Sequence, residues 1–222
     1  MTLWTSLPTG QRAWIATLGF VVLIAQIEPP FPETAYLHHV PTAMLVAAAP
    51  WLLWRWPLST GSVARIAVFL LLHTLGGRYT YSNVPYDEWA AALTGGTISE
   101  AMGWTRNHYD RLVHLAFGLC IAGPAAEVLE RRLGMTPARA AWFALEFILA
   151  ASCVYELFEW ALTLIAAGPI ANEYNGQQGD LWDAQKDMAL AAAGAAMAIG
   201  WQAMAESALR RELDPKAERT RE

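Results

Sequence analysis

Long apolar segments constrain this chain more than any other feature of its sequence. Hydrophobic residues make up 55% of the 222 residues and charged residues only 16%, against about 25% charged residues in an average soluble domain. An α-helix needs about 20 mostly apolar residues to cross the hydrocarbon core of a bilayer. The sequence therefore predicts an all-α, polytopic membrane helix bundle with about six transmembrane helices, over residues 12–28, 36–56, 63–79, 109–127, 138–167 and 184–205.

The distribution of Lys and Arg predicts the orientation of these helices. With both termini in the cytoplasm, 11 of the 15 Lys and Arg residues lie on the cytoplasmic side; the other four are Arg78, Arg106, Arg111 and Lys186. Cytoplasmic loops of membrane proteins carry an excess of positive charge. We expect a single transmembrane helical domain over residues 1–207 and a charged cytoplasmic tail over residues 208–222. Residues 12–28 lack a small-residue cleavage site, so we interpret them as a retained span.

Charge and cysteine content exclude several classes of protein. The net charge is −5, and the basic residues of the tail are diluted by acidic ones, which argues against nucleic-acid binding. Cys120 and Cys153 both lie in apolar segments, and two cysteines do not make a disulfide framework. The loop over residues 80–108 is expected to form a short helix near residues 86–93 at the outer surface, with Ser99 as a candidate cap.

Ionisable residues gather at one level of the predicted bundle. In the predicted topology, four spans bring His and carboxylate side chains to the outer half of the membrane. Pairs of these residues are spaced by three or four positions, which places each pair on one helix face. Ionisable groups inside a membrane are costly and mark functional sites by default. The residues are His73, the pair Asp110 and His114, the pair Glu156 and Glu159, and the pair Asp183 and Asp187.

Imidazole and carboxylate groups are typical ligands of divalent cations in helix bundles. We therefore expect a divalent metal ion (Zn, Fe or Mn), with Glu159 as a general base or as a group that orients a ligand. Arg78 and Arg106 are expected to bind an anionic head group, and Tyr79 lies next to Arg78. The candidate metal ligands are His73, Asp110, His114, Glu156, Asp183 and Asp187.

Structural roles compete with these functional ones. Asp180 or Asp183 is also suited to cap the last span, and Asp110 to pair with Arg106 or Arg111. His73 alone on its span is typical of a hydrogen-bonded packing residue, and His38 and His39 are expected to serve the membrane interface. Arg and Tyr near the ends of spans are common interfacial anchors.

The sequence resembles the YjdF-like family of bacterial inner-membrane proteins, a group without an established activity. The resemblance rests on four stretches that run from the third predicted span to the sixth: His73–Pro85, Arg106–His114, Glu156–Trp160 and Gln178–Asp187. A weaker likeness is to VanZ-like membrane proteins, on Asp110-Arg-Leu-Val-His114 and the acidic residues that follow. These resemblances imply a multi-pass protein of the bacterial inner membrane and imply no reaction.

Three functions are compatible with this sequence. The first is a metal-dependent membrane enzyme, a hydrolase or group transferase, acting on a lipid-linked or amphiphilic substrate with membrane lipids as its surroundings. The second is a proton- or cation-coupled transporter, for which Glu127, Glu130 and Glu146 are the residues available deeper in the bundle. The third is a scaffold with a polar core. The acids gather at one level, and this favours the enzyme.

Overall fold

Helices account for all the regular structure in the described part of the chain. The computed structural model describes residues 2–165 and 175–213, with side chains as far as residue 209. Each of the six predicted spans falls on one long helix, and the predicted all-α fold is confirmed for the described residues. The long helices are α1 (Thr9–Ala25), α2 (Pro32–Arg55), α3 (Thr60–Arg78), α6 (Tyr109–Leu133), α7 (Pro137–Ile165) and α9 (Asp183–Leu213).

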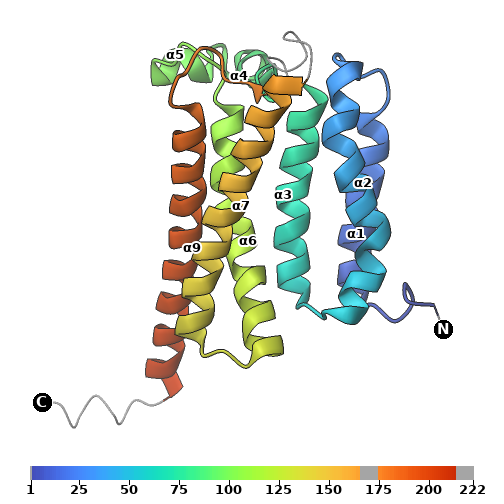
Figure 1. Cartoon of the computed structure of the whole chain (residues 1–222), viewed down its shortest axis with the longest axis vertical. Coiled ribbons are helices and arrows are strands. Elements are labelled where there is room, and N and C mark those ends of the chain that lie inside the picture. Colours follow the sequence, from blue (N-terminus) through green and yellow to red (C-terminus); the bar gives the residue numbers. More distant parts are fainter. Residues whose placement is uncertain (1, 166–174, 214–222) are drawn as a thin grey trace, which may run out of the picture.

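Four of these helices are long and apolar enough to cross a membrane, namely α3, α6, α7 and residues Asp183–Leu209 of α9. Helix α1 is apolar but has 17 residues, and α2 has 24 residues with Pro41 and Pro50 inside it. Both run alongside α3 (Figure 1). The chain is therefore a helical membrane protein, whereas the count of six spans with cytoplasmic termini stays a prediction.

The long helices form two groups of three. Helices α1, α2 and α3 contact one another, α6 contacts both α7 and α9, and α3 and α6 join the two groups (Figure 1). Small clusters of apolar side chains fill each group. Leu18, Val22 and Leu70 pack between α1 and α3, whereas Ala122, Ile148 and Ala191 pack between α6, α7 and α9.

Helices α6 and α9 approach each other most closely. A Cβ atom at Gly118 would overlap the carbonyl oxygen of Ala191, and a Cβ atom at Gly194 would overlap that of Leu115. Small residues allow helix backbones to approach in membranes, where packing drives association. This close contact brings the first turns of α6 and α9 together, and those turns carry the acidic residues.

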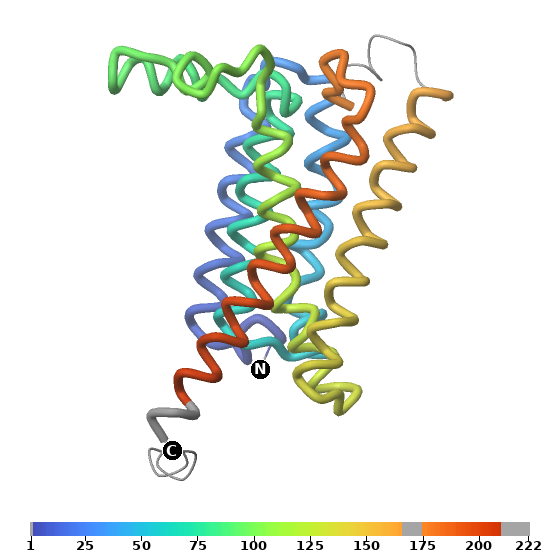
Figure 2. The backbone as a smooth tube through the Cα atoms, turned by 90° about the vertical axis from the view of Figure 1, so that its left-hand side faces the viewer, coloured from blue at the N-terminus to red at the C-terminus, as the bar shows by residue number. Residues whose placement is uncertain are grey.

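The loops at one end of the bundle, which we call the loop end, complete this region. Helix α4 (Tyr86–Thr94) confirms the predicted short helix, and α5 (Ile98–Met102) follows it. Both project sideways from the bundle (Figure 2). The cap of α5 is Thr97 rather than Ser99, because Thr97 and Glu100 form a reciprocal capping box. Residues 166–174 and the tail from residue 214 lie outside the described part of the chain.

Candidate metal centre

Four ionisable side chains from three helices meet near the loop end; we call them the acid–histidine cluster: Asp110, His114, Glu156 and Asp187. His114 Nε2 lies 3.5 Å from Asp110 Oδ1 and 3.9 Å from Glu156 Oε1. One ligand atom from each of Asp110, His114 and Asp187 lies within 4.8 Å of the others. Helix α6 contributes the first two residues one turn apart, which is the i, i+4 spacing predicted from the sequence.

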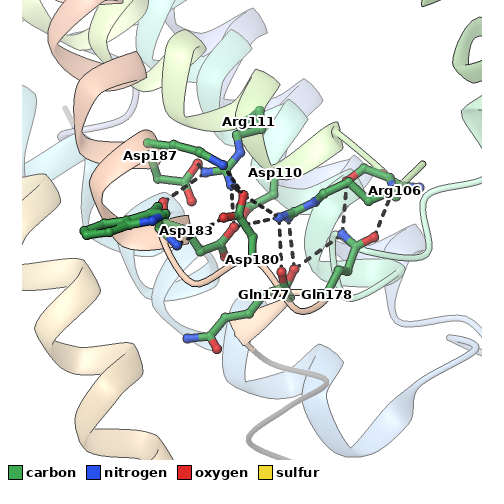
Figure 3. A network of polar contacts seen from close by, with 12 residues as sticks. Arg106, Asp110, Arg111, Gln177, Gln178, Asp180, Asp183 and Asp187 are labelled. Carbon is green, nitrogen blue, oxygen red and sulfur yellow. Dashed lines mark hydrogen bonds and ion pairs between the residues drawn. The ribbon is translucent and has the colours of Figure 1, made fainter. Parts of the chain in front are cut away.

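A second set of charges surrounds this cluster, and we call it the arginine–aspartate network: Arg106, Arg111, Asp180, Asp183 and Lys186. Arg106 Nη1 and Arg111 Nη2 both donate to Asp183 Oδ1, at 2.8 and 2.5 Å. Arg111 Nη1 lies 2.7 Å from Asp187 Oδ1. Figure 3 shows both guanidinium groups pointing towards Asp180 and Asp183. Arg111 therefore links the network to the cluster.

The charges in this region do not balance. The cluster and the network together hold five carboxylates, on Asp110, Glu156, Asp180, Asp183 and Asp187, and three permanent cations. The side chain of Asp187 is only 2% exposed and that of Glu156 9%. Glu156 Oε1 has no hydrogen-bond partner among the described residues. Because buried charges must be paired, a protonated His114 or a bound cation would each reduce this excess of carboxylates.

The structure separates the predicted metal ligands into three groups. Asp110, His114 and Asp187 come together, with Glu156 beside them. Asp183 is held by Arg106 and Arg111, so its Oδ1 atom is already paired. His73 lies on α3 and hydrogen-bonds to the backbone of α2, as the competing packing role predicted.

The residues predicted to act on a substrate also lie apart. Glu159 is on α7, one turn beyond Glu156, and its backbone oxygen accepts from Asn175 Nδ2. Arg106 donates to the carbonyl oxygens of Gly176 and Gln177 as well as to Asp183. These bonds already occupy much of the Arg106 guanidinium group. The contact of Arg106 with a head group stays a prediction.

Arg78 and Tyr79 do not join the cluster. Arg78 Nη1 donates to the carbonyl oxygens of Ala25 and Ile27, at 2.8 and 2.9 Å, where α1 ends. Cations are favourable at the C-terminal end of a helix. The guanidinium lies over the ring of Tyr79, which packs edge-on against Trp89. These contacts tie α1 to α3, and any role for the two residues in chemistry remains a prediction.

Local contacts shift the pKa values of two groups beside the arginine–aspartate network, Asp180 and His108. Asp180 Oδ2 accepts from Lys186 Nζ and Oδ1 accepts from the Trp182 amide, and these bonds lower the pKa of Asp180 to about 2. The second bond closes a turn just before α9, because Trp182 precedes the first residue of that helix, and the predicted capping of α9 by Asp180 or Asp183 stays a prediction. Burial and the neighbouring cations Arg106 and Arg111 lower the pKa of His108. The network is therefore built for ionised Asp180 and neutral His108.

A histidine–tyrosine pair lies near the cluster and was not predicted. His73 Nε2 donates to the carbonyl oxygen of His38, so Nδ1 of the same ring accepts a hydrogen bond from the Tyr81 hydroxyl group. Thr80 and Tyr81 have φ values of 52° and 56°, which is uncommon for residues other than glycine. This strained turn directs the Tyr81 ring back over α3.

The two glycines before this turn explain how it fits. A Cβ atom at Gly76 would lie 2.6 Å from Cε1 of Tyr81, and one at Gly77 would lie 2.6 Å from Cβ of His38. His38 and His39 are accordingly buried, at 1% and 2% exposure. Their predicted place at the membrane interface is wrong, because the missing side chains of α3 leave room for both rings inside the bundle. Gly76 and Gly77 were the sequence signal that could have predicted this packing.

A cavity of about 340 Å³ borders the cluster. Its wall is mostly apolar and comes from α2, α3, α6 and α7. Ligand sites typically occupy about 300–1,000 Å³ and combine apolar walls with a few polar groups. The polar groups at this wall include His73, Tyr81, Asp110 and His114. The cavity thus connects the histidine–tyrosine pair to two members of the cluster.

The apolar helices and the buried polar cluster together define a helical membrane protein with an ionisable site near one end of its bundle. Comparison with known sequences agrees. The profile of the family described as "Predicted membrane protein (DUF2238)" matches residues 10–208, and the chain belongs to this family.

One curated relative is the inner membrane protein YjdF of Escherichia coli (strain K12), with 37% identity over 142 residues. The match covers 64% of this chain and 64% of the relative, so the whole relative is not represented. No solved structure matches the chain. The predicted resemblance to YjdF-like proteins is confirmed, and so is the predicted location, a multi-pass protein of the bacterial inner membrane.

Proposed function

We propose that this protein is a metal-dependent membrane enzyme, a hydrolase or group transferase that acts on a lipid-linked or amphiphilic substrate. The observation that carries the proposal is the convergence of Asp110, His114 and Asp187 within 4.8 Å. Two carboxylates and an imidazole suit Zn²⁺, Fe²⁺ or Mn²⁺. Catalytic metal sites commonly use three protein ligands and leave a position for water or substrate.

The surrounding residues support roles around such an ion. Glu156 Oε1 lies 3.9 Å from His114 Nε2 and has no hydrogen-bond partner among the described residues, so it is suited to be a fourth ligand or a general base. Glu159 is the alternative base. Arg111 contacts Asp187 and would orient that ligand. A divalent ion would also offset the excess of two carboxylates in this region.

The transporter alternative needs polar groups that continue away from the cluster. Glu127 lies towards the opposite end of α6, where it accepts hydrogen bonds from Ser59 and Ser62 and pairs with Arg131. Glu146 is exposed on the outer side of α7. The described core between these levels is apolar, with Ala122, Ile148 and Ala191 buried. These placements favour an enzyme with a one-sided site over a conducting pathway.

The proposal includes the predicted topology of six spans with both termini in the cytoplasm. In this topology the cluster lies towards the outer face, because α6 and α9 both begin at the loop end. Four helices meet the criteria for a span, and α1 and α2 run beside them. A substrate would then reach the metal from the outer leaflet.

The test is metal content, measured by mass spectrometry on protein purified without a chelator. We expect one divalent ion per chain in the wild type and its loss in His114→Ala and Asp187→Ala. His108→Ala is the matched control and should keep the ion, because His108 stacks on Trp104 outside the cluster. A folded wild type without metal would overturn the proposal. Proton-coupled flux in vesicles would then become the measurement to make.

A further inference from the structure

The cavity beside the cluster has an open side. Pro41 and Leu45 of α2 line it and are also exposed at the surface. Helices α2 and α7 both contribute to its wall, yet in the described structure they do not pack against each other. The cavity therefore opens sideways between α2 and α7, and α7 is long and apolar enough to cross a membrane.

Helix α7 provides the reason for this opening. Its fully buried residues are Ala140, Ala144, Ile148 and Ser152, one per turn, and beyond Ser152 its described residues are half-buried or exposed as whole residues, although the side chain of Glu156 points inward. Figure 2 shows α7 leaning away from the rest of the bundle towards its C-terminal end. The space that α7 leaves against α3 and α6 is the cavity, where Phe69 and Phe117 lie.

One end of the cavity is polar and incompletely bonded. Ser152 is only 2% exposed, and its Oγ atom has no hydrogen-bond partner among the described residues. An unsatisfied buried hydroxyl costs free energy, so it indicates a missing partner. Asp110 and His114 line the same cavity, so a molecule inside it would contact the proposed metal centre.

We propose that this cavity binds the hydrocarbon chain of a single-chain amphiphile, which enters from the bilayer between α2 and α7 and places an anionic, oxygen-bearing head group at Asp110 and His114. This inference deepens the proposed function. The position of the head group rests on the proposed metal centre, because without a bound cation the carboxylates would repel an anion. The binding of the hydrocarbon chain does not depend on a metal and rests on the apolar wall of the cavity. A carboxylate and a phosphate share the required chemistry.

The test is photolabelling of the purified protein in vesicles of phosphatidylethanolamine and phosphatidylglycerol, with a diazirine-bearing palmitic acid as the probe. We expect labels on Phe69, Phe117 or Leu45, which line the cavity. Excess hexadecyl phosphate should compete at least as well as palmitate if phosphate is the preferred head group, and less well if carboxylate is preferred.

Filling the cavity should strongly reduce this labelling. Ser152→Phe and Leu45→Trp are each expected to lower it about tenfold, a factor equivalent to about 1.4 kcal/mol of binding free energy. Val154→Phe is the matched control, because Val154 is 65% exposed on the outer side of α7. Labels confined to outward residues such as Phe147, and unchanged in both variants, would overturn the inference.

The metal content of the same samples separates this inference from the proposed function. If Ser152→Phe keeps its metal and loses the label, both stand. If the wild type holds no metal but is labelled inside the cavity, the binding of a hydrocarbon chain in the cavity stands and the metalloenzyme proposal fails. If Ser152→Phe and Leu45→Trp both keep the label and the metal, the enzyme proposal stands and the proposed binding of a hydrocarbon chain in the cavity is refuted. Thermal unfolding in detergent checks that each variant is folded.

Discussion

Individual residues in this bundle are placed by the need to compensate buried charge. Asp183 and Asp187 are both buried, at 4% and 2% exposure, and Arg111 contacts both. Removing one partner of a buried pair leaves the other charge uncompensated. Arg111 is therefore the residue whose loss should disturb the region most, whereas the half-exposed Lys186 should matter little.

The substitution Arg111→Met tests this at the residue scale. It keeps much of the apolar volume and removes the charge, so we expect a loss of about 3–5 kcal/mol in the free energy of unfolding. Lys186→Met is the control and should change stability only slightly. Thermal and denaturant unfolding in detergent provide the measurement. Equal effects of the two substitutions would mean that the network contributes nothing specific.

Acid sensitivity is a second prediction at this scale, and it concerns Asp180. Because its pKa is lowered to about 2 in the folded protein, from an ordinary value of 3.8, the folded state favours the ionised form. The resulting stabilisation is fully present above about pH 4 and is lost as the pH falls towards 2. Asp180→Asn should therefore be less stable than the wild type at pH 5 and approach it at pH 2. A difference that does not vary over this range would contradict the assignment.

At the scale of the elements, the contact between α6 and α9 determines the geometry of the proposed metal centre. Gly118 and Gly194 allow the two backbones to meet, and Asp110, His114 and Asp187 lie on these two helices. Any displacement of α9 from α6 separates Asp187 from its partners. Helix α7 leans away from the bundle towards its C-terminal end, and that half carries Glu156 and Glu159.

The substitution Gly118→Ala tests the importance of this contact. The added methyl group meets backbone atoms of α9 that cannot yield without moving the helix, so we expect a loss of about 1–3 kcal/mol in stability together with weaker metal retention. Gly200→Ala on α9 is the control, because a Cβ atom there meets nothing within 4 Å; alanine should be neutral or stabilise the helix. Similar unfolding temperatures for both variants would show that the close approach is not required.

At the scale of the whole molecule, two three-helix groups meet through α3 and α6, and the acid–histidine cluster lies within the group of α6, α7 and α9. The cavity spans both groups, since α2 and α3 belong to one and α6 and α7 to the other. A relative movement of the groups would therefore change the cavity and leave the Asp110–His114 spacing on α6 unchanged. The orientation of this site in the membrane follows from the predicted topology.

Reporter fusions test that topology. A green fluorescent protein joined after Leu213 should fluoresce, because we expect this end in the cytoplasm, and alkaline phosphatase inserted after Gly103 should be active, because we expect the loop between α5 and α6 outside. The excess of Lys and Arg on the cytoplasmic side is the physical reason. The reverse pattern would place the acid–histidine cluster towards the cytoplasm and would contradict the predicted access from the outer leaflet.

The sequence by itself determined the helices, the membrane class and the level at which the acids gather. Each follows from local chemistry: a segment in lipid must satisfy its backbone within itself, and the i, i+4 spacing of Asp110 and His114 fixes their common face. The family resemblance rests on stretches that include these residues, and the profile match over residues 10–208 confirmed the family.

Only the tertiary structure decided which of these residues meet. Asp183 and Asp187 share a face of α9, yet their partners differ. Asp183 pairs with both arginines, whereas Asp187 contacts Arg111 and lies near Asp110 and His114. His73 pairs with Tyr81 across a strained turn that the sequence indicated only through Gly76 and Gly77. These partners depend on how each helix is rotated and how closely it packs against its neighbours, and no periodicity within a single helix encodes that.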